Sequence, residues 1–273
     1  MNRALPLTGA LAEAALRFAR DGGTPVQPRP ASTVILLRDK EHGPQVYLLR
    51  RTASMAFAAG MTVFPGGRVD PGDAALADAW VGPPPAEFAT RMGCPEQMAV
   101  AFVAAAVRET FEESGVLLAG PSADSVVADT SGDDWEAERI ALEGRSLSFA
   151  DFLHGRGLVL RADLLGVWAH WITPEFEPRR YDTRFFVAAL PAGQKTRDVS
   201  GESDEVTWLD SSEAVELVDA GEMAMLPPTY VSCSEISAYE SVQQVLAASR
   251  EREIRTILPR TRIEGDTVYL EES

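Results

Sequence analysis

The alternation of apolar and polar positions predicts a series of β-strands up to about residue 210. Short runs rich in Val, Ile, Leu and aromatic residues, bounded by turn-forming residues, are typical of strands. Such runs lie at 31–38, 45–51, 61–64, 163–172, 181–190 and 204–209. Before the first of them, residues 22–30 contain three prolines, which predicts an irregular lead-in rather than a helix.

A period of three to four residues replaces the alternation between residues 96 and 114 and predicts a helix there. The apolar residues that recur on one face are Val100, Val103, Val107 and Phe111. Gly115 follows directly and suits the left-handed residue that commonly ends a helix.

Weaker patterns predict further helices. They lie near the N-terminus, within 135–156, after Asp210, and as one long helix over 234–253, with a hairpin turn at 264–266. Strands interleaved with helices predict an α/β (α+β) fold with one mixed sheet between helical layers.

The same pattern predicts how the chain is organised. We expect a main domain over 31–210, an N-terminal helix and lead-in over 1–30, and a C-terminal helical extension over 211–273 packed on the same domain. Two segments without a clear strand period, 71–96 and 119–160, are expected to be insertions.

Charge and composition narrow the classes of partner. The 273 residues carry 41 acidic and 25 basic side chains and a net charge of −16, which disfavours nucleic acid and anionic membrane surfaces. Two distant cysteines, Cys94 and Cys233, indicate reduced thiols rather than a disulfide framework. No apolar run approaches the ~18 residues of a membrane helix, so we expect a soluble, cytoplasmic protein.

The candidate chemistry lies near the end of the helix over 96–114. Glu109, Glu112 and Glu113 fall within about 100° of arc on one helix face. Carboxylates this close repel one another and oppose the helix dipole. Two interpretations remain open: a solvated acidic face, or a site for a hard cation such as Mg²⁺ or Mn²⁺.

A glycine loop favours the second interpretation. The strand over 61–64 runs into Pro65, Gly66 and Gly67, and glycine permits a close approach of the backbone to another group. A strand, a glycine loop and an acidic helix make a place where a carbonyl and carboxylates share a metal.

These residues resemble the Nudix box. The matching positions are Gly67, Asp73 (where the family usually has glutamate), Arg108, Glu109, Glu112, Glu113, Gly115 and Val116. The 34 residues over 74–107 replace a short spacer, and an insertion at this point is similar to that of the peroxisomal coenzyme A diphosphatases.

The resemblance implies a Nudix-type α/β/α sandwich and metal-dependent hydrolysis of nucleoside diphosphates linked to another moiety. It implies Mg²⁺ or Mn²⁺ on Glu109, Glu112, Glu113 and the Gly67 carbonyl, and an Arg108 that orients a carboxylate. The expected partner of Arg108 is Asp73, with Asp70 as the substitute. One of the three glutamates or a later acid would act as base; Glu202 and Glu205 are either such acids or loop charges.

Coenzyme A or acyl-coenzyme A is the preferred substrate, because two further stretches, 48–67 and 177–186, resemble the same branch. Arginines near or within them are either phosphate ligands or surface ion pairs: Arg50, Arg51, Arg68, Arg179, Arg180 and Arg184. ADP-ribose or another small nucleotide conjugate, and a non-catalytic nucleotide-binding module, are the alternatives. A homodimer stays open.

Overall fold

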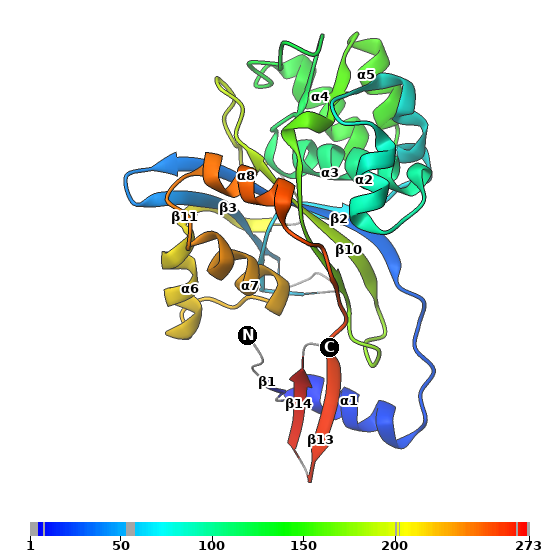
Figure 1. The fold of residues 1–273 in the computed structure, drawn as a ribbon, viewed down its shortest axis with the longest axis vertical. Helices are drawn as coiled ribbons and strands as arrows, with labels where there is room; N and C mark the ends of the chain where they lie inside the picture. The colour runs from blue at the N-terminus through cyan, green and yellow to red at the C-terminus, as the bar shows by residue number, and fades with distance from the viewer. Residues whose placement is uncertain are drawn as a thin grey trace.

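A mixed β-sheet forms the centre of the molecule in this computed structural model (Figure 1). The structure describes residues 5–7, 9–52, 58–199, 201, 203–265 and 267–271. Within them the main sheet has the order β11-β3-β2-β10-β9-β12, with β10 parallel to β2 and β12 parallel to β9. Its strands are β2 Arg29–Lys40, β3 Gly43–Arg51, β9 Gly166–Ile172, β10 Tyr181–Ala189, β11 Ser203–Asp210 and β12 Thr256–Ile257. Two short strands, β4 (Thr62–Val63) and β5 (Gly66–Arg68), pair with β3 and β2.

Alternation along β2 explains why helices cover both faces of the sheet. Val34 and Leu36 point into one apolar core, and Ile35 and Leu37 point into the other, as the two-residue period of a strand requires. The first core is shared with α3 (Glu96–Ser114) and its neighbours, and the second with helices that follow β11. Figure 1 shows these two helical groups on opposite sides of the sheet, which confirms the predicted fold class.

Helix α3 has the bounds that the apolar period predicts. Gly115 ends it with φ +73°, and its N–H donates to the Phe111 carbonyl at 2.9 Å. The helix packs on β2 and β5, so its C-terminal half lies against the glycine loop.

The two expected insertions are folded and contact each other. The first contains the 3₁₀ segment η1 (Pro71–Ala79), β6 (Trp80–Val81) and α2 (Pro85–Met92). The second contains β7 Ala119–Gly120, α4 Asp133–Glu143, α5 Phe149–Gly155 and β8 Val159–Arg161, with the turn η2 (Ala162–Leu164) after it. Strands β6, β8 and β7 pair into a small sheet, which joins segments that lie far apart in the sequence.

The prediction of one long helix over 234–253 is wrong. The chain instead forms α7 (Pro227–Ile236) and α8 (Val242–Glu251). The Ser241 side chain accepts a hydrogen bond from the Gln244 N–H at 3.3 Å and starts the second helix, because serine favours a helix N-terminus over a helix interior. With α6 (Ser211–Asp219), these helices cover the second face of the sheet.

The C-terminal extension over 211–273 is only partly helical, because the chain after α8 contains strands. Besides β12, it forms the hairpin of β13 (Arg260–Glu264) and β14 (Thr267–Glu271), as the turn residues predict. Strand β14 also pairs with β1 (Leu5–Leu7) and packs near α1 (Gly9–Arg20). The two ends of the described chain therefore meet in one small sheet. The domain boundaries at 30 and 210 stay a prediction.

No helix among the described residues is long and apolar enough to cross a membrane. Both cysteines are free, and Cys233 is buried.

Candidate active site

The acidic end of α3 is enclosed by the fold. Only 13% of the Glu109 side chain and 11% of the Glu112 side chain are exposed, and Glu113 is buried. Segment η1 and strand β5 pack against this helix. The burial excludes the interpretation of a solvated acidic face.

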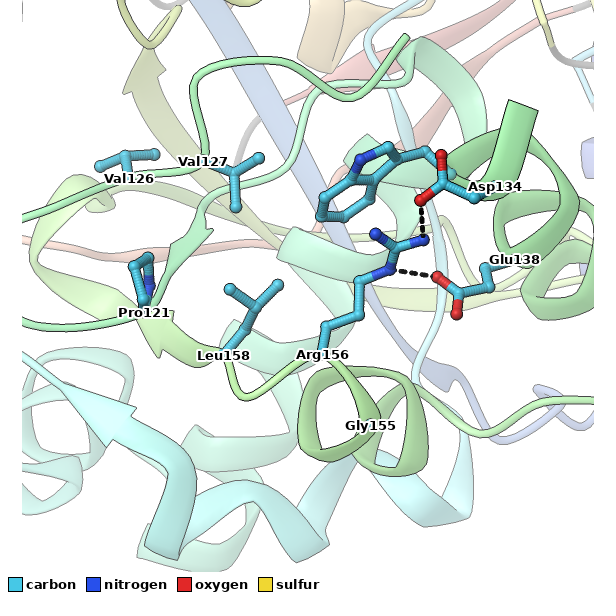
Figure 2. Close-up of a pocket in the computed structure, with 9 residues that line it drawn as sticks. Pro121, Val126, Val127, Asp134, Glu138, Gly155, Arg156 and Leu158 are labelled. Carbon is cyan, nitrogen blue, oxygen red and sulfur yellow. Dashed lines mark hydrogen bonds and ion pairs between the residues drawn. The ribbon is translucent and has the colours of Figure 1, made fainter. Parts of the chain in front are cut away.

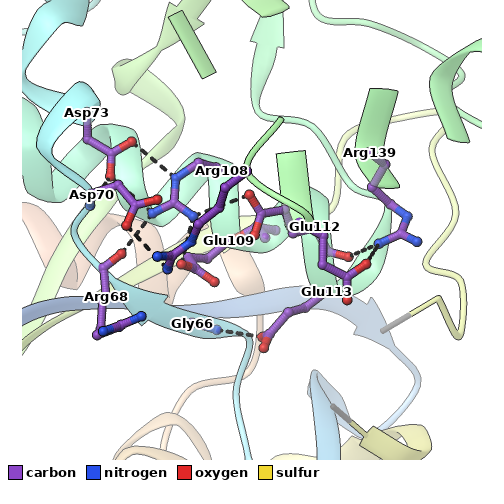
Figure 3. Close-up of polar contacts among 12 residues, drawn as sticks. Gly66, Arg68, Asp70, Asp73, Arg108, Glu109, Glu112, Glu113 and Arg139 are labelled. Carbon is purple, nitrogen blue, oxygen red and sulfur yellow. Dashed lines mark hydrogen bonds and ion pairs between the residues drawn. The ribbon is translucent and has the colours of Figure 1, made fainter. Parts of the chain in front are cut away.

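Arg108 lies at the centre of a buried ionic cluster (Figure 3). It forms a bidentate pair with Asp73, with Nε–Oδ1 and Nη2–Oδ2 distances of 3.1 and 3.0 Å. Its Nη1 donates to Glu109 at 2.8 Å and to Glu112 at 3.3 Å, and its Nη2 also donates to the Arg68 carbonyl at 2.8 Å. The aspartate at position 73 is therefore long enough for the pair that the resemblance implies.

Asp70 does not take the place of Asp73 as the partner of Arg108. Its side chain lies 3.5 Å from Arg145, and its backbone N–H donates to the Asp73 carboxylate at 2.8 Å. Asp70 thus helps to orient Asp73 instead of replacing it.

Burial changes the titration of these carboxylates. Removal from water raises the pKa of Glu109 to about 7 even though Arg108 opposes the rise. Burial also raises the pKa values of Glu112 and Asp73. Burial lowers the pKa of Arg108, but the negative charges of Glu109, Asp73 and Glu112 outweigh this effect. The pKa of Arg108 is therefore raised overall. One guanidinium facing three carboxylates leaves a surplus of negative charge, which a cation would relieve.

The glycine loop touches the same carboxylates. The Gly66 N–H donates to Glu113 Oε2 at 2.8 Å. A Cβ atom on Gly67 would lie 2.5 Å from the Glu109 carboxyl group, so only glycine leaves room for this contact. The loop and the helix form one site, as the sequence predicts.

The carboxylates are engaged by partners within the protein: Arg108 contacts Glu109 and Glu112, and Gly66 contacts Glu113. Among the residues that the structure describes, no group of three or more His, Cys, Asp or Glu side chains is arranged to hold a metal ion. The donor chemistry nevertheless fits a hard cation. All donors are oxygens, they carry surplus negative charge, and no imidazole or thiol of the described chain lies in the cluster.

Three groups that sequence reasoning missed cap the end of α3. Arg139 donates to the Glu112 carbonyl at 2.7 Å, the Arg197 N–H to the Ser114 carbonyl at 2.9 Å, and the Thr130 hydroxyl to the Gly115 carbonyl at 2.6 Å. Arg139 lies where the sequence predicts a helix, but all three contacts join segments that are apart in the chain, so no local signal identifies them.

Tyr47 is a further buried neighbour. Burial raises its pKa, with added effects from the charges of Asp198 and Glu113. The hydroxyl group donates to the Arg197 carbonyl at 3.2 Å. Tyr47 thus connects β3 to the segment that caps α3.

The candidate arginines fall into two groups, and the first group lies around the glycine loop. Arg50 of β3 pairs with Asp204 at 2.7 Å and with Glu205 at 3.0 Å. Glu205 is therefore an ion-pair partner of Arg50 in this structure. Arg51 is half-buried at the end of the same strand, and Arg68 is exposed next to Gly67. Glu202 lies outside the described residues.

The second group is Arg179, which is exposed, with Arg180 and Arg184, which are buried. Arg180 donates to the carbonyls of Thr173 and Val26 at 2.9 and 2.8 Å. The role of this group in substrate binding stays a prediction.

Arg184 is held by the fold on the α3 side of the sheet. It stacks on Phe102 at 4.8 Å, donates to the Met92 carbonyl at 3.2 Å and pairs with Asp182. Phe102 precedes Glu109 by seven residues, which is about 10 Å along the helix. In the sheet, Arg184 pairs with Ser32 of β2, and Ser32 pairs in turn with Gly67 of β5.

The aromatic side chains and the histidine of β9 and β10 have structural roles. Trp168, Trp171 and Phe185 belong to the second apolar core, and Phe186 to the first. His170 has partners on both ring nitrogens, Asp182 at 2.6 Å and Thr256 at 2.8 Å.

Comparisons with known proteins agree with this geometry. The sequence profile of the NUDT19 Nudix domain matches residues 22–236. A putative nudix hydrolase 7 of Caenorhabditis elegans is 27% identical over 263 residues, which cover 90% of this chain and 76% of that protein. The acyl-coenzyme A diphosphatase NUDT19 of Gallus gallus is 25% identical over 76% of this chain and 65% of its own length. A Nudix hydrolase structure from Alicyclobacillus acidocaldarius superposes with a TM-score of 0.72 at 25% identity, over 81% of this chain and 96% of that one.

Proposed function

This chain belongs to the Nudix hydrolases, in the branch of the NUDT19 Nudix domain, and we propose that it is a metal-dependent coenzyme A diphosphatase. The reaction would add water across the diphosphate of coenzyme A or an acyl derivative. The products would be 3′,5′-ADP and phosphopantetheine or its acyl form. A relative that carries the name acyl-coenzyme A diphosphatase supports this substrate class.

The observation that carries the proposal is the buried contact between the acidic end of α3 and the glycine loop. Mg²⁺ or Mn²⁺ held by Glu109, Glu112, Glu113 and the Gly67 carbonyl would neutralise diphosphate oxygens and make a bound water more acidic. The protein supplies the positions of these ligands. Gly66 orients Glu113 through its N–H, and the absence of a side chain at Gly67 admits Glu109.

Arg108 contributes by orientation. It holds Glu109 and Glu112 through one nitrogen, while Asp73 fixes the other side of its guanidinium. A bidentate pair fixes the plane of an arginine more tightly than a single contact. Arg108 therefore keeps Glu109 and Glu112 close together at the glycine loop and offsets part of their mutual repulsion.

The charge of the substrate explains where its binding groups are expected. Coenzyme A carries a diphosphate and a 3′-phosphate, and the protein has a net charge of −16, so local cations must compensate. Arg68 follows Gly67 directly and is exposed, and Arg50 and Arg51 end the strand that pairs with β4. We propose Arg68 and Arg51 as the phosphate ligands closest to the reacting diphosphate, joined by Arg50 if it releases Asp204 and Glu205.

A substrate panel tests the proposal. Purified protein with Mg²⁺ or Mn²⁺ is incubated with coenzyme A, an acyl-coenzyme A, dephospho-coenzyme A and ADP-ribose, and the products are separated by chromatography. Higher kcat/KM for the coenzyme A compounds supports the proposal. Preference for ADP-ribose would replace the substrate and retain the diphosphatase. A lack of hydrolysis, with ligands that still raise Tm, would identify a binding module.

A further inference from the structure

The C-terminal end of α3 is held by hydrogen-bond donors from outside the helix. Arg139 of α4 reaches the carbonyl of Glu112, a candidate metal ligand, at 2.7 Å (Figure 3). The carbonyls of Ser114 and Gly115 accept from Arg197 and Thr130. Helix ends normally leave such carbonyls without partners inside the helix, and here the segments over 119–160 and 191–199 supply them.

An ionic network built around the buried Arg139 holds these donors. Only 3% of the Arg139 side chain is exposed, and it pairs with Glu136 at 2.7 Å and with Glu143 at 3.0 Å. Glu136 also pairs with Arg197 at 2.8 Å. Two cations and two anions balance within the network, so it adds no net charge to the acidic site.

Gly115, which ends α3, lies in close contact with Arg197. A Cβ atom there would lie 2.7 Å from the Arg197 guanidinium, which also donates to the Thr130 carbonyl at 3.2 Å. The helix thus ends in a fixed place against both segments.

This attachment matters because the helix end is electrostatically unfavourable. Three carboxylates lie near the negative end of the helix dipole and repel one another. The Glu112 carbonyl and carboxylate belong to the same residue, so a displacement at the carbonyl moves the side chain. Arg139 therefore acts on the carboxylate through the backbone.

We propose that Arg139 is a positioning residue that sets the place of Glu112 and Glu113 for metal binding and diphosphate hydrolysis. The inference rests on the proposed function. It assigns to the insertion over 119–160 a role in the reaction, although none of its side chains belongs to the Nudix box.

The variant Arg139→Gln tests this role, with Arg156→Gln as the matched control. Arg156 lies in the same insertion, pairs with Asp134 and Glu138 of α4, and stacks on Trp135 at 3.6 Å. It lines an open pocket of about 630 Å³, and Figure 2 shows its guanidinium paired with Asp134 and Glu138. Both variants lose one cation from the insertion, but only Arg139 donates to the Glu112 carbonyl.

For Arg139→Gln we expect kcat to fall about 10- to 100-fold, because displacements near 1 Å have effects of this size. The KM for coenzyme A should change less than about twofold, because Arg139 does not face the proposed phosphate ligands. Binding of Mn²⁺ alone, measured by electron paramagnetic resonance without substrate, should weaken. Arg139→Lys, which keeps a cationic donor, should recover part of both losses, and Arg156→Gln should resemble the wild type.

Each contrary result has a defined meaning. Equal kcat and Mn²⁺ binding in Arg139→Gln and Arg156→Gln would overturn the positioning role, as would losses that follow Tm alike in both variants. A wild type that hydrolyses no diphosphate, while Arg139→Gln still weakens Mn²⁺ binding, would refute the proposed function and leave the positioning role intact. A wild type that binds no Mn²⁺ would overturn both.

Discussion

Substitution of Gly67 by alanine isolates the contact between the glycine loop and the acidic helix. The new Cβ atom would lie 2.5 Å from the Glu109 carboxyl group, whereas ordinary contacts begin near 3.4 Å. The carboxyl group must therefore move by about 1 Å. Gly67 lies in β5 and has no positive φ, so alanine adopts its backbone conformation and the effect is confined to this contact.

We expect Gly67→Ala to lower kcat about 100-fold, the effect of a misplacement near 1 Å, which corresponds to roughly 2.7 kcal/mol of transition-state stabilisation. Overpacking should also cost about 1–3 kcal/mol of folding stability, measured by urea denaturation. Gly72→Ala is the control, because a Cβ atom there meets nothing within 4 Å. Steady-state assays of both variants with coenzyme A decide the matter: a Gly67→Ala enzyme within threefold of the wild type would refute the reasoning.

Three other predictions use different parts of the structure. Asp73→Asn weakens the buried bidentate pair with Arg108, while Glu109 and Glu112 still compensate the guanidinium, and should lower the free energy of unfolding by about 1–3 kcal/mol; an unchanged free energy of unfolding in urea denaturation would contradict this. Burial raises the pKa of Asp182, but hydrogen bonding and charge from its partners hold it below the ordinary 3.8. Its stabilising effect is therefore complete above about pH 4 and lost as pH falls through the folded-state pKa, so Asp182→Asn should flatten the acid limb of a stability–pH curve. Arg68→Ala should raise the KM for coenzyme A several-fold with little change in Tm, whereas Arg180→Ala should lower Tm, because its guanidinium holds two carbonyls; the reverse pattern would exchange the two roles.

The sequence predicts most of what depends on local pattern. The bounds of α3 and the glycine at its end follow from the apolar period and from the conformational freedom of Gly115. The pairing of Arg108 with Asp73 follows from the Nudix-box resemblance, although 34 residues separate the two in the chain.

Other features could not be predicted from local pattern. The break between α7 and α8 depends on Ser241 as a helix start, which competes with a continuous apolar pattern, and on the distant Asp39, whose carboxylate accepts from the Val242 N–H at 2.8 Å. The burial of Arg180 and Arg184 could not be predicted, because arginine in a strand-like run is equally compatible with a phosphate site and with carbonyl partners. The capping role of Arg139 depends on the contact between α4 and the end of α3. No spacing of residues in the sequence predicts such a contact.

The most direct test of the central claim is the product pattern of Glu113→Gln beside the wild type. Glutamine keeps an oxygen that accepts from the Gly66 N–H, so the fold should be retained, while the negative charge is lost. With coenzyme A and Mg²⁺, the wild type should release 3′,5′-ADP and phosphopantetheine in equal amounts, and Glu113→Gln should do so slower by orders of magnitude at a similar Tm. Equal rates for the two proteins would show that the acidic end of α3 is not the site of diphosphate hydrolysis.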